Sequence, residues 1–121
     1  MAAPAPRIVQ YVVLRADLRA PAWTRGALVA QACHACLAAV HLSREQADTQ
    51  RYLEQLDSMA TVVLQAPDEE SLVKLSQRLT EEQVDHKLWV EQPENCPTCL
   101  ALRPCPKEQV QGLMKNLKLL K

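Results

Sequence analysis

Four short runs of mostly apolar residues, rich in β-branched side chains, recur along the chain. They are IVQYVVLR (8–15), TVVLQA (61–66), HKLWV (86–90) and TCLALR (98–103). Apolar residues fill these runs almost continuously, which is typical of strands buried on both faces of a sheet. Pro67 stops the second run, because proline cannot continue a central strand. The pattern therefore predicts four strands.

The second and third of four predicted helices carry recognisable start signals. Ser43 with Gln46 three residues later is a capping-box pattern, which predicts an amphipathic helix over 44–56. Acidic residues crowd the start of a helix over 68–82, where the helix dipole favours negative charge. A last helix is expected over 107–117.

The remaining helix, over 26–42, carries a narrow polar stripe on an otherwise apolar surface. Thr24 can cap it, and apolar residues occur almost all round it, so we expect it to be largely buried. At about 100° per residue, Gln31, His34 and His41 fall within about 80° of one another. Burying such groups without a partner costs about 1 to 3 kcal/mol, so the stripe must line a pocket or pair internally. A histidine bonded to a carbonyl inside the core is the alternative interpretation of His34.

The order of these elements is strand, helix, helix, strand, helix, strand, strand, helix. It predicts an α/β fold with three layers, α/β/α, in which helices cover both faces of a four-stranded mixed sheet. The chain has 121 residues, which is enough for one hydrophobic core. We expect one domain over 8–121, preceded by a flexible Ala/Pro-rich tail over 1–7.

Charge is balanced overall, with 14 basic and 14 acidic residues, but it is unevenly distributed. The first 42 residues hold four arginines against one aspartate, and the last 19 hold five basic residues against one glutamate. If the two ends meet, they form a basic face that attracts phosphate; otherwise the charges are scattered and solvated. No apolar run is long enough for a membrane span, and none follows a basic start as in a signal peptide. We expect a cytoplasmic protein, and the sequence leaves a mitochondrial location open.

Five cysteines raise the question of a metal site. The pairs Cys33/Cys36 and Cys96/Cys99 have the spacing of a zinc tetrad. However, the first pair lies in the middle of a predicted helix, on the side away from the polar stripe, and the second pair opens a predicted strand. We therefore expect small thiols packed in the core, with no metal and no cofactor.

The polar stripe belongs to VAQACHACLAA (29–39), and three further segments accompany it in order. They are IVQYVVLRADL (8–18), VVLQAPDEESLVKL (62–75) and TCLALRP (98–104). Together these segments resemble the type II peptidyl-tRNA hydrolases, the archaeal and eukaryotic kind, over residues 8–121. The stretch 88–108 is most similar to an animal subgroup of that family. The resemblance implies the family fold and cleavage of the ester that joins a peptide to the 3′-terminal ribose of tRNA.

The resemblance also implies roles for individual residues. Gln31 and His34 match the helix positions of the family's active site, Asp17 the loop acid, Thr98 the threonine that opens the last strand, and Glu91 the acid before it. With tRNA as the expected partner, the candidates for binding it are Arg19, Trp23, Arg25 and Arg103. Trp89, in a strand, is expected to pack in the core, and stacking on a base is the alternative.

Two departures from the family pattern affect this interpretation. Ala27 stands where the family has the second lysine of Lys-Gly-Lys, and the loop 91–97 is shorter than its Asp-Ala-Gly-x-Thr counterpart. Arg25, at the first lysine, keeps a charge nearby but with a different geometry. The alternative function is therefore a catalytically weak or inactive relative that binds tRNA or a protein. A homodimer is left open.

Overall fold

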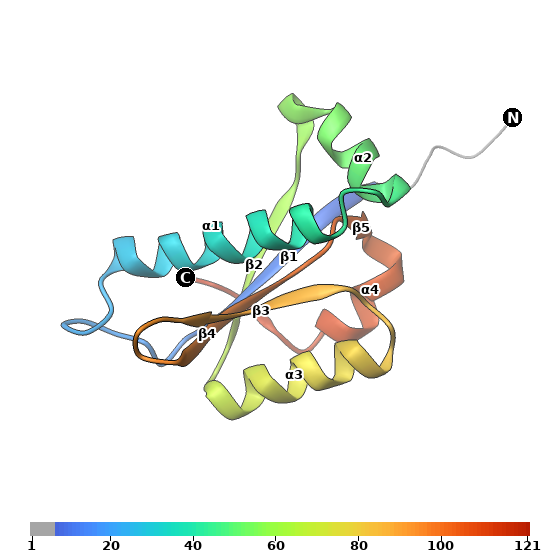
Figure 1. Ribbon diagram of the computed structural model, residues 1–121. Helices are drawn as coiled ribbons and strands as arrows, with labels where there is room; N and C mark the ends of the chain where they lie inside the picture. Colours follow the sequence, from blue (N-terminus) through green and yellow to red (C-terminus); the bar gives the residue numbers. More distant parts are fainter. Residues whose placement is uncertain (1–6) are drawn as a thin grey trace, which may run out of the picture.

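The computed structural model describes residues 7–121 (Figure 1). The predicted tail over 1–7 lies outside the described residues except for Arg7, which is exposed. The strands are β1 (Ile8–Arg15), β2 (Thr61–Ala66), β3 (His86–Glu91), β4 (Cys96–Leu102), β5 (Cys105–Pro106) and β6 (Lys118–Leu119). The helices are α1 (Arg25–Leu42), α2 (Ala47–Glu54), α3 (Glu69–Glu81) and α4 (Lys107–Met114), with a 3₁₀ turn at Leu56–Ser58.

The sheet is open and mixed, in the order β3-β4-β1-β2-β6, with β5 also paired to β1. It has six strands, so the prediction of four was wrong. The four predicted strands all form, and β1 pairs in parallel with β2 and antiparallel with β4. The two additional strands, β5 and β6, contain two residues each, which is too short to leave an apolar pattern in the sequence.

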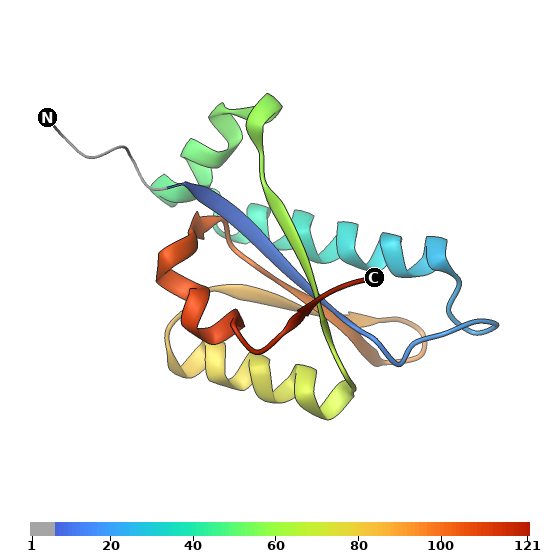
Figure 2. The ribbon, with the colours of Figure 1, turned by 180° about the vertical axis from the view of Figure 1, so that it is seen from behind.

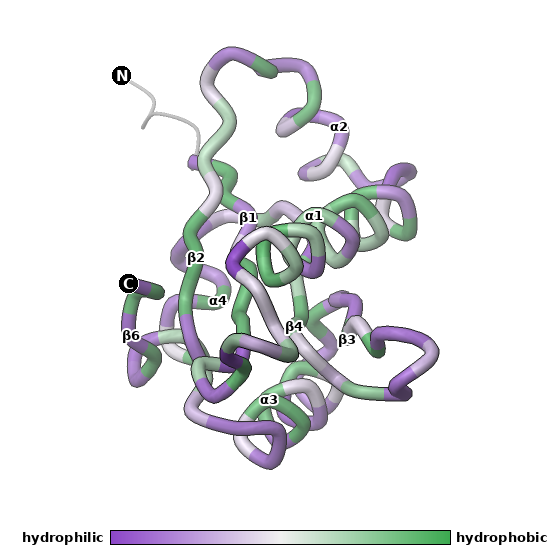
Figure 3. The backbone as a smooth tube through the Cα atoms, turned by 90° about the vertical axis from the view of Figure 1, so that its left-hand side faces the viewer, coloured by the Kyte–Doolittle hydropathy of each residue, from purple (hydrophilic) through white to green (hydrophobic). Residues whose placement is uncertain are grey.

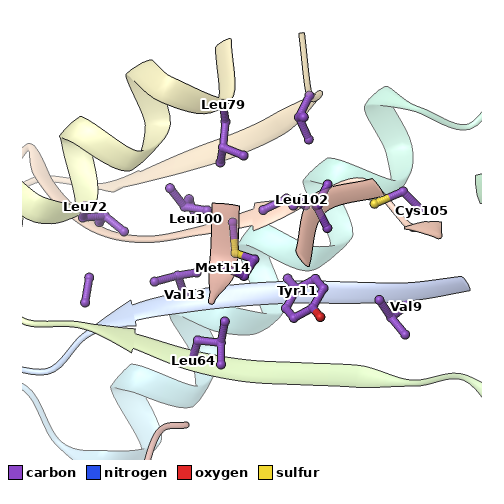
Figure 4. Close-up of a cluster of buried hydrophobic side chains, with 13 residues drawn as sticks. Val9, Tyr11, Val13, Leu64, Leu72, Leu79, Leu100, Leu102, Cys105 and Met114 are labelled. Atoms are coloured by element: carbon purple, nitrogen blue, oxygen red, sulfur yellow. The ribbon is translucent and has the colours of Figure 1, made fainter. Parts of the chain in front are cut away.

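Helices lie on both faces of the sheet (Figures 1 and 2). On one face, α3 and α4 pack onto β1, β2 and β4 through a cluster that includes Tyr11, Val13, Leu72 and Leu100 (Figure 4). On the other face, α1 packs through Ala35 and Ala39 onto a smaller cluster of strand residues. The small alanine side chains let α1 lie close to the sheet, which brings its polar stripe next to β3 and β4.

One side of α1 is more exposed than the sequence predicted. Val29, Leu37 and Leu42 are exposed, and so is Cys33, which we had expected in the core. Hydrophobic positions recur along the whole of α1 (Figure 3), so apolarity alone could not identify the buried side. Within residues 7–121, no helix combines the length and the apolar character that crossing a membrane requires.

The second helix begins later than predicted because Ser43 has a different role. The Ser43 hydroxyl donates to the carbonyl of Ala39 at 2.8 Å and lies 2.8 Å from the Thr49 hydroxyl. Ser43 therefore terminates α1 instead of capping α2, whose N-cap position is Gln46.

Candidate active site

The site residues gather at one edge of the sheet. β1, β2 and β3 run in the same direction, because β1 is parallel to β2 and both β1 and β3 are antiparallel to β4. Their carboxyl ends therefore share an edge, where β4 begins and the chain enters α1 (Figure 1). Open α/β sheets bind ligands outside the carboxyl ends of their strands. Asp17, Glu91 and Thr98 reach this edge from three strands.

A β-bulge at Thr98 turns an additional side chain toward α1. Trp89 pairs with Cys99, but the next residue, Val90, pairs with Pro97, so Thr98 is an extra residue in β4. Without the bulge, neighbouring side chains would point to opposite faces of the sheet. With it, the Thr98 hydroxyl and the Cys99 thiol both reach Gln31 on α1, at 3.1 Å from its side-chain oxygen and 3.3 Å from its carbonyl oxygen.

Gln31 connects Thr98 to Glu91 through hydrogen bonds at both ends of its side-chain amide. The Thr98 hydroxyl donates to Oε1 of Gln31, so the amide is oriented with Nε2 toward Glu91, where it donates to Oε2 at 3.0 Å. Gln31 is 2% exposed and Thr98 is fully buried. A buried side-chain amide has a fixed orientation when its oxygen and its nitrogen both have hydrogen-bond partners. Gln31 and Thr98 are therefore suited to hold Glu91, which is half-buried, in place.

Glu91 receives a second hydrogen bond from its own strand. Nε1 of Trp89 donates to Oε1 of Glu91 at 3.1 Å. The bonds from Gln31 and then Trp89, with a smaller contribution from the charge of His34, hold the pKa of the Glu91 carboxyl below its ordinary value. Glu91 is therefore a carboxylate at neutral pH.

His34 completes the site at the surface. Its ring stacks on Trp89 with centroids 4.9 Å apart and planes inclined by 28°. His34 is exposed, so the interpretation of this residue as a core histidine was wrong. The site thus presents an accessible imidazole beside a fixed carboxylate, with Gln31 and Thr98 behind them.

Removing the Thr98 hydroxyl should destabilise the fold. In Thr98→Val the shape is nearly kept, but Oε1 of buried Gln31 loses its donor, so we expect the free energy of unfolding to fall by about 1 to 3 kcal/mol. Urea denaturation followed by circular dichroism measures this. Thr80→Val is the matched control, because the Thr80 hydroxyl is exposed and bonds only within its helix. Equal stability of the two variants would contradict the proposed role of Thr98.

Asp17 lies at the same edge but belongs to a different set of contacts. Arg15 donates two hydrogen bonds to the Asp17 carboxylate, at 3.0 and 2.8 Å. It also donates to the carbonyl of Pro97 at 3.0 Å. Within residues 7–121, Asp17 makes no hydrogen bond to Gln31 or Glu91. The hydrogen bonds from Arg15 lower the pKa of Asp17. Asp17 thus connects to the site only through Arg15 and the residue before Thr98.

The lowered pKa of Asp17 predicts how stability depends on pH. A carboxyl whose pKa is depressed by folding stabilises the protein above its unfolded pKa of about 3.9, and this contribution is lost as pH falls through the lower, folded value. Asp17→Asn should therefore be less stable than the wild type at pH 7, and the difference should shrink below about pH 4. Unfolding measured at pH 7 and pH 3 tests this. A difference that stays constant with pH would contradict it.

Arg25 and Ala27 lie on different sides of α1. Residues two positions apart on a helix are separated by about 200°. Ala27 is one turn before Gln31 and on the same side, whereas Arg25 lines a groove that α1 forms on its other side. Arg25 and residue 27 therefore start from different sides of the helix, and Arg25 lines the groove.

That groove has a volume of about 1010 Å³ and lies along the first half of α1. Its floor is apolar, with Leu28 and Val63 among the lining residues. Its charged lining residues are all basic, and Trp23 adds an aromatic ring. Three of the predicted tRNA-binding residues, with one from the C-terminus, thus come together: Arg19, Trp23, Arg25 and Lys121.

Arg103 lies apart from these residues. It follows β4 at the opposite edge of the sheet, where Nη1 is 3.3 Å from the Asp48 carboxylate and its side chain is only 12% exposed. The two basic ends of the chain therefore meet only in part, through Lys121 at the groove.

The sequence analysis missed the roles of Trp89 and Arg15. Residues two apart on a strand face the same side, so once Glu91 was chosen, Trp89 could have been placed beside it. Arg15 left no such signal, because its contact with Pro97 joins segments that are 82 residues apart.

The five cysteines differ in their exposure. Cys99 and Cys105 are buried, Cys36 and Cys96 half-buried and Cys33 exposed. Burial raises the pKa of the Cys36 thiol to about 11 and that of Cys99 to about 12, so both stay protonated. Across the described part of the chain, no three His, Cys, Asp or Glu side chains are grouped so that they could hold a metal ion.

Comparison with known proteins identifies the family of this chain. The family model described as "Peptidyl-tRNA hydrolase PTH2" matches residues 8–120. The chain is 53% identical over 116 residues to "Putative peptidyl-tRNA hydrolase PTRHD1" of Homo sapiens and to that of Mus musculus, covering 94% of this chain and 83% of each relative. It is 35% identical over 119 residues to "Probable peptidyl-tRNA hydrolase 2" of Dictyostelium discoideum, covering 91% of this chain and 53% of that protein. The chain therefore belongs to the PTH2 family of peptidyl-tRNA hydrolases.

Proposed function

We propose that this chain hydrolyses the ester between a peptide, or an N-blocked aminoacyl group, and the terminal ribose of tRNA, which frees the tRNA for reuse. Family membership and the names of its relatives support the reaction. The observation that carries the proposal is the hydrogen-bonded series from Thr98 through Gln31 to Glu91, which ends beside the exposed imidazole of His34.

Each group has a chemical task in this reaction. His34 takes a proton from a water molecule as the water oxygen attacks the ester carbonyl carbon. The bond from that carbon to the ribose oxygen then breaks, and the proton returns to the ribose oxygen. Each oxygen of Glu91 accepts one hydrogen bond from the protein and keeps a lone pair free to align the water or the imidazole.

The groove on the other side of α1 supports tRNA binding. Arg19, Arg25 and Lys121 supply positive charge for phosphates, and Trp23 supplies a ring on which a base can stack. All five cysteines lie within residues 7–121 and are free thiols. This supports a location in the cytoplasm, which is a reducing compartment.

The test is release of an N-blocked amino acid from charged tRNA. We expect release above the rate in buffer, with a defect in Arg25→Ala that appears mainly in KM and weakens as salt screens the phosphates. No release at high concentrations of enzyme would overturn the hydrolase proposal.

A binding module is the second candidate, and Ala27 is the observation that favours it. An ester hydrolase stabilises the developing oxyanion, and the loss of one group that does so costs about 10²- to 10³-fold in rate. Salt-dependent tRNA binding without turnover would support this candidate. Failure to bind tRNA at low salt would exclude the hydrolase and a tRNA-binding module, and would leave a module that binds a protein.

A further inference from the structure

Trp89 contacts both accessible groups of the site, and neither the family match nor the names of the relatives assign it a role. Its ring stacks on His34, while its Nε1 donates to Glu91. By contrast, Gln31 donates to Glu91 and Thr98 donates to Gln31, and within residues 7–121 neither makes a hydrogen bond to His34. Trp89 therefore contacts His34 with its ring and Glu91 with its N–H.

The surroundings of Trp89 make it suited to this task. It packs against the buried cluster between α1 and the sheet, which includes Ala35 and Cys99, so the core supports its ring. A tryptophan has only two side-chain torsions, and holding it in place costs little conformational entropy. His34 is exposed and has no such support of its own. Stacking on a supported ring restricts the plane of the imidazole.

Residue 27 is an alanine and offers no positive charge to Glu91. The hydrogen bond from Trp89 is therefore more important for holding the Glu91 carboxylate. Glu91 is held by two neutral donors, the amide of Gln31 and the indole of Trp89. A carboxylate fixed by two bonds loses its orientation when either is removed, because one bond leaves it free to rotate. Trp89 thus supplies one of the two side-chain hydrogen bonds that orient this carboxylate.

We propose that Trp89 is a positioning residue that fixes the imidazole of His34 and the carboxylate of Glu91 relative to each other. The catalytic consequence of this arrangement rests on the proposed hydrolase function. The arrangement itself does not, because it can be measured in the free protein.

Nuclear magnetic resonance tests the arrangement with two variants. Trp89→Phe keeps an aromatic ring but loses the N–H, and Trp89→Leu loses both. Ring-current effects should move the His34 ring protons upfield in the wild type, less in Trp89→Phe and not in Trp89→Leu. The titration midpoint of the Glu91 carboxyl should rise in both variants, since the donor from Trp89 is gone. Trp23→Phe is the control, because Trp23 lies in the groove and should leave both signals unchanged.

Unchanged His34 shifts and an unchanged Glu91 midpoint in Trp89→Phe would overturn the proposal, even if Trp89→Leu does not fold. For hydrolysis, we expect kcat of Trp89→Phe to fall about 10- to 100-fold with little change in KM, since misplaced groups slow the chemical step. A loss of kcat/KM of the same size that comes from a higher KM, with kcat unchanged, would contradict a positioning role. If the wild type releases nothing from charged tRNA, the hydrolase proposal fails, while the resonance measurements still decide the role of Trp89.

Discussion

His34→Ala is expected to lower kcat for release of an N-blocked amino acid from charged tRNA by about 10²- to 10⁴-fold, the range for loss of a general base. His34 is exposed at the surface of the site, beside Glu91 and stacked on Trp89. KM should change little, because tRNA is expected to bind through the basic groove on the other side of α1. Single-turnover and steady-state kinetics on the same charged tRNA measure both constants.

His41→Ala is the matched control for this experiment. His41 is also exposed and lies two turns further along the same side of α1, where it contacts Arg44. Its removal should leave kcat unchanged, and neither variant should lose much stability because both side chains are exposed. Equal losses in the two variants, or full activity of His34→Ala, would remove His34 from the mechanism.

Much of the fold was predictable because the longer strands of this chain coincide with nearly continuous apolar runs. The first strand forms as predicted over residues 8–15, since burial on both faces leaves a strong local signal. The second also forms as predicted, over 61–66, although it is only partly buried. The helix α1 was also predictable, but its buried side was not. Alanine, valine and leucine occur all round it, and contacts with the sheet decide which of them are covered.

Only those parts of the site that lie on a single helix or strand could be predicted from the sequence. Gln31 and His34 share a helix face, and that is a local property of the sequence. The bulge at Thr98 depends on how β4 pairs with β3, and the bond from Gln31 to Glu91 joins residues 60 positions apart. Such contacts arise from tertiary packing and leave no local periodicity. The same reason explains why the role of Arg15 was missed.

Position 27 offers a test in which activity is gained. In Ala27→Lys, a lysine stands one turn before Gln31 on the same side of α1, from which its ammonium can reach toward Glu91 and the developing oxyanion. We expect kcat/KM for ester cleavage to rise about 10²-fold, the lower end of the effect of one such group. Helix α1 should tolerate the change, since lysine is a good helix former and the N-cap bond of Thr24 goes to the backbone of residue 27.

Leu37→Lys separates a local effect of this lysine from a general effect of charge. It adds the same charge to α1 at a side chain that is 72% exposed and lies more than two turns beyond Ala27. If Ala27→Lys acts on the oxyanion, it raises kcat and Leu37→Lys does not, and the gain persists at high salt. If added charge merely attracts tRNA, both variants lower KM alone and the effect disappears as salt increases. That second result, or no gain at all, would show that the residue at 27 does not limit catalysis by this chain.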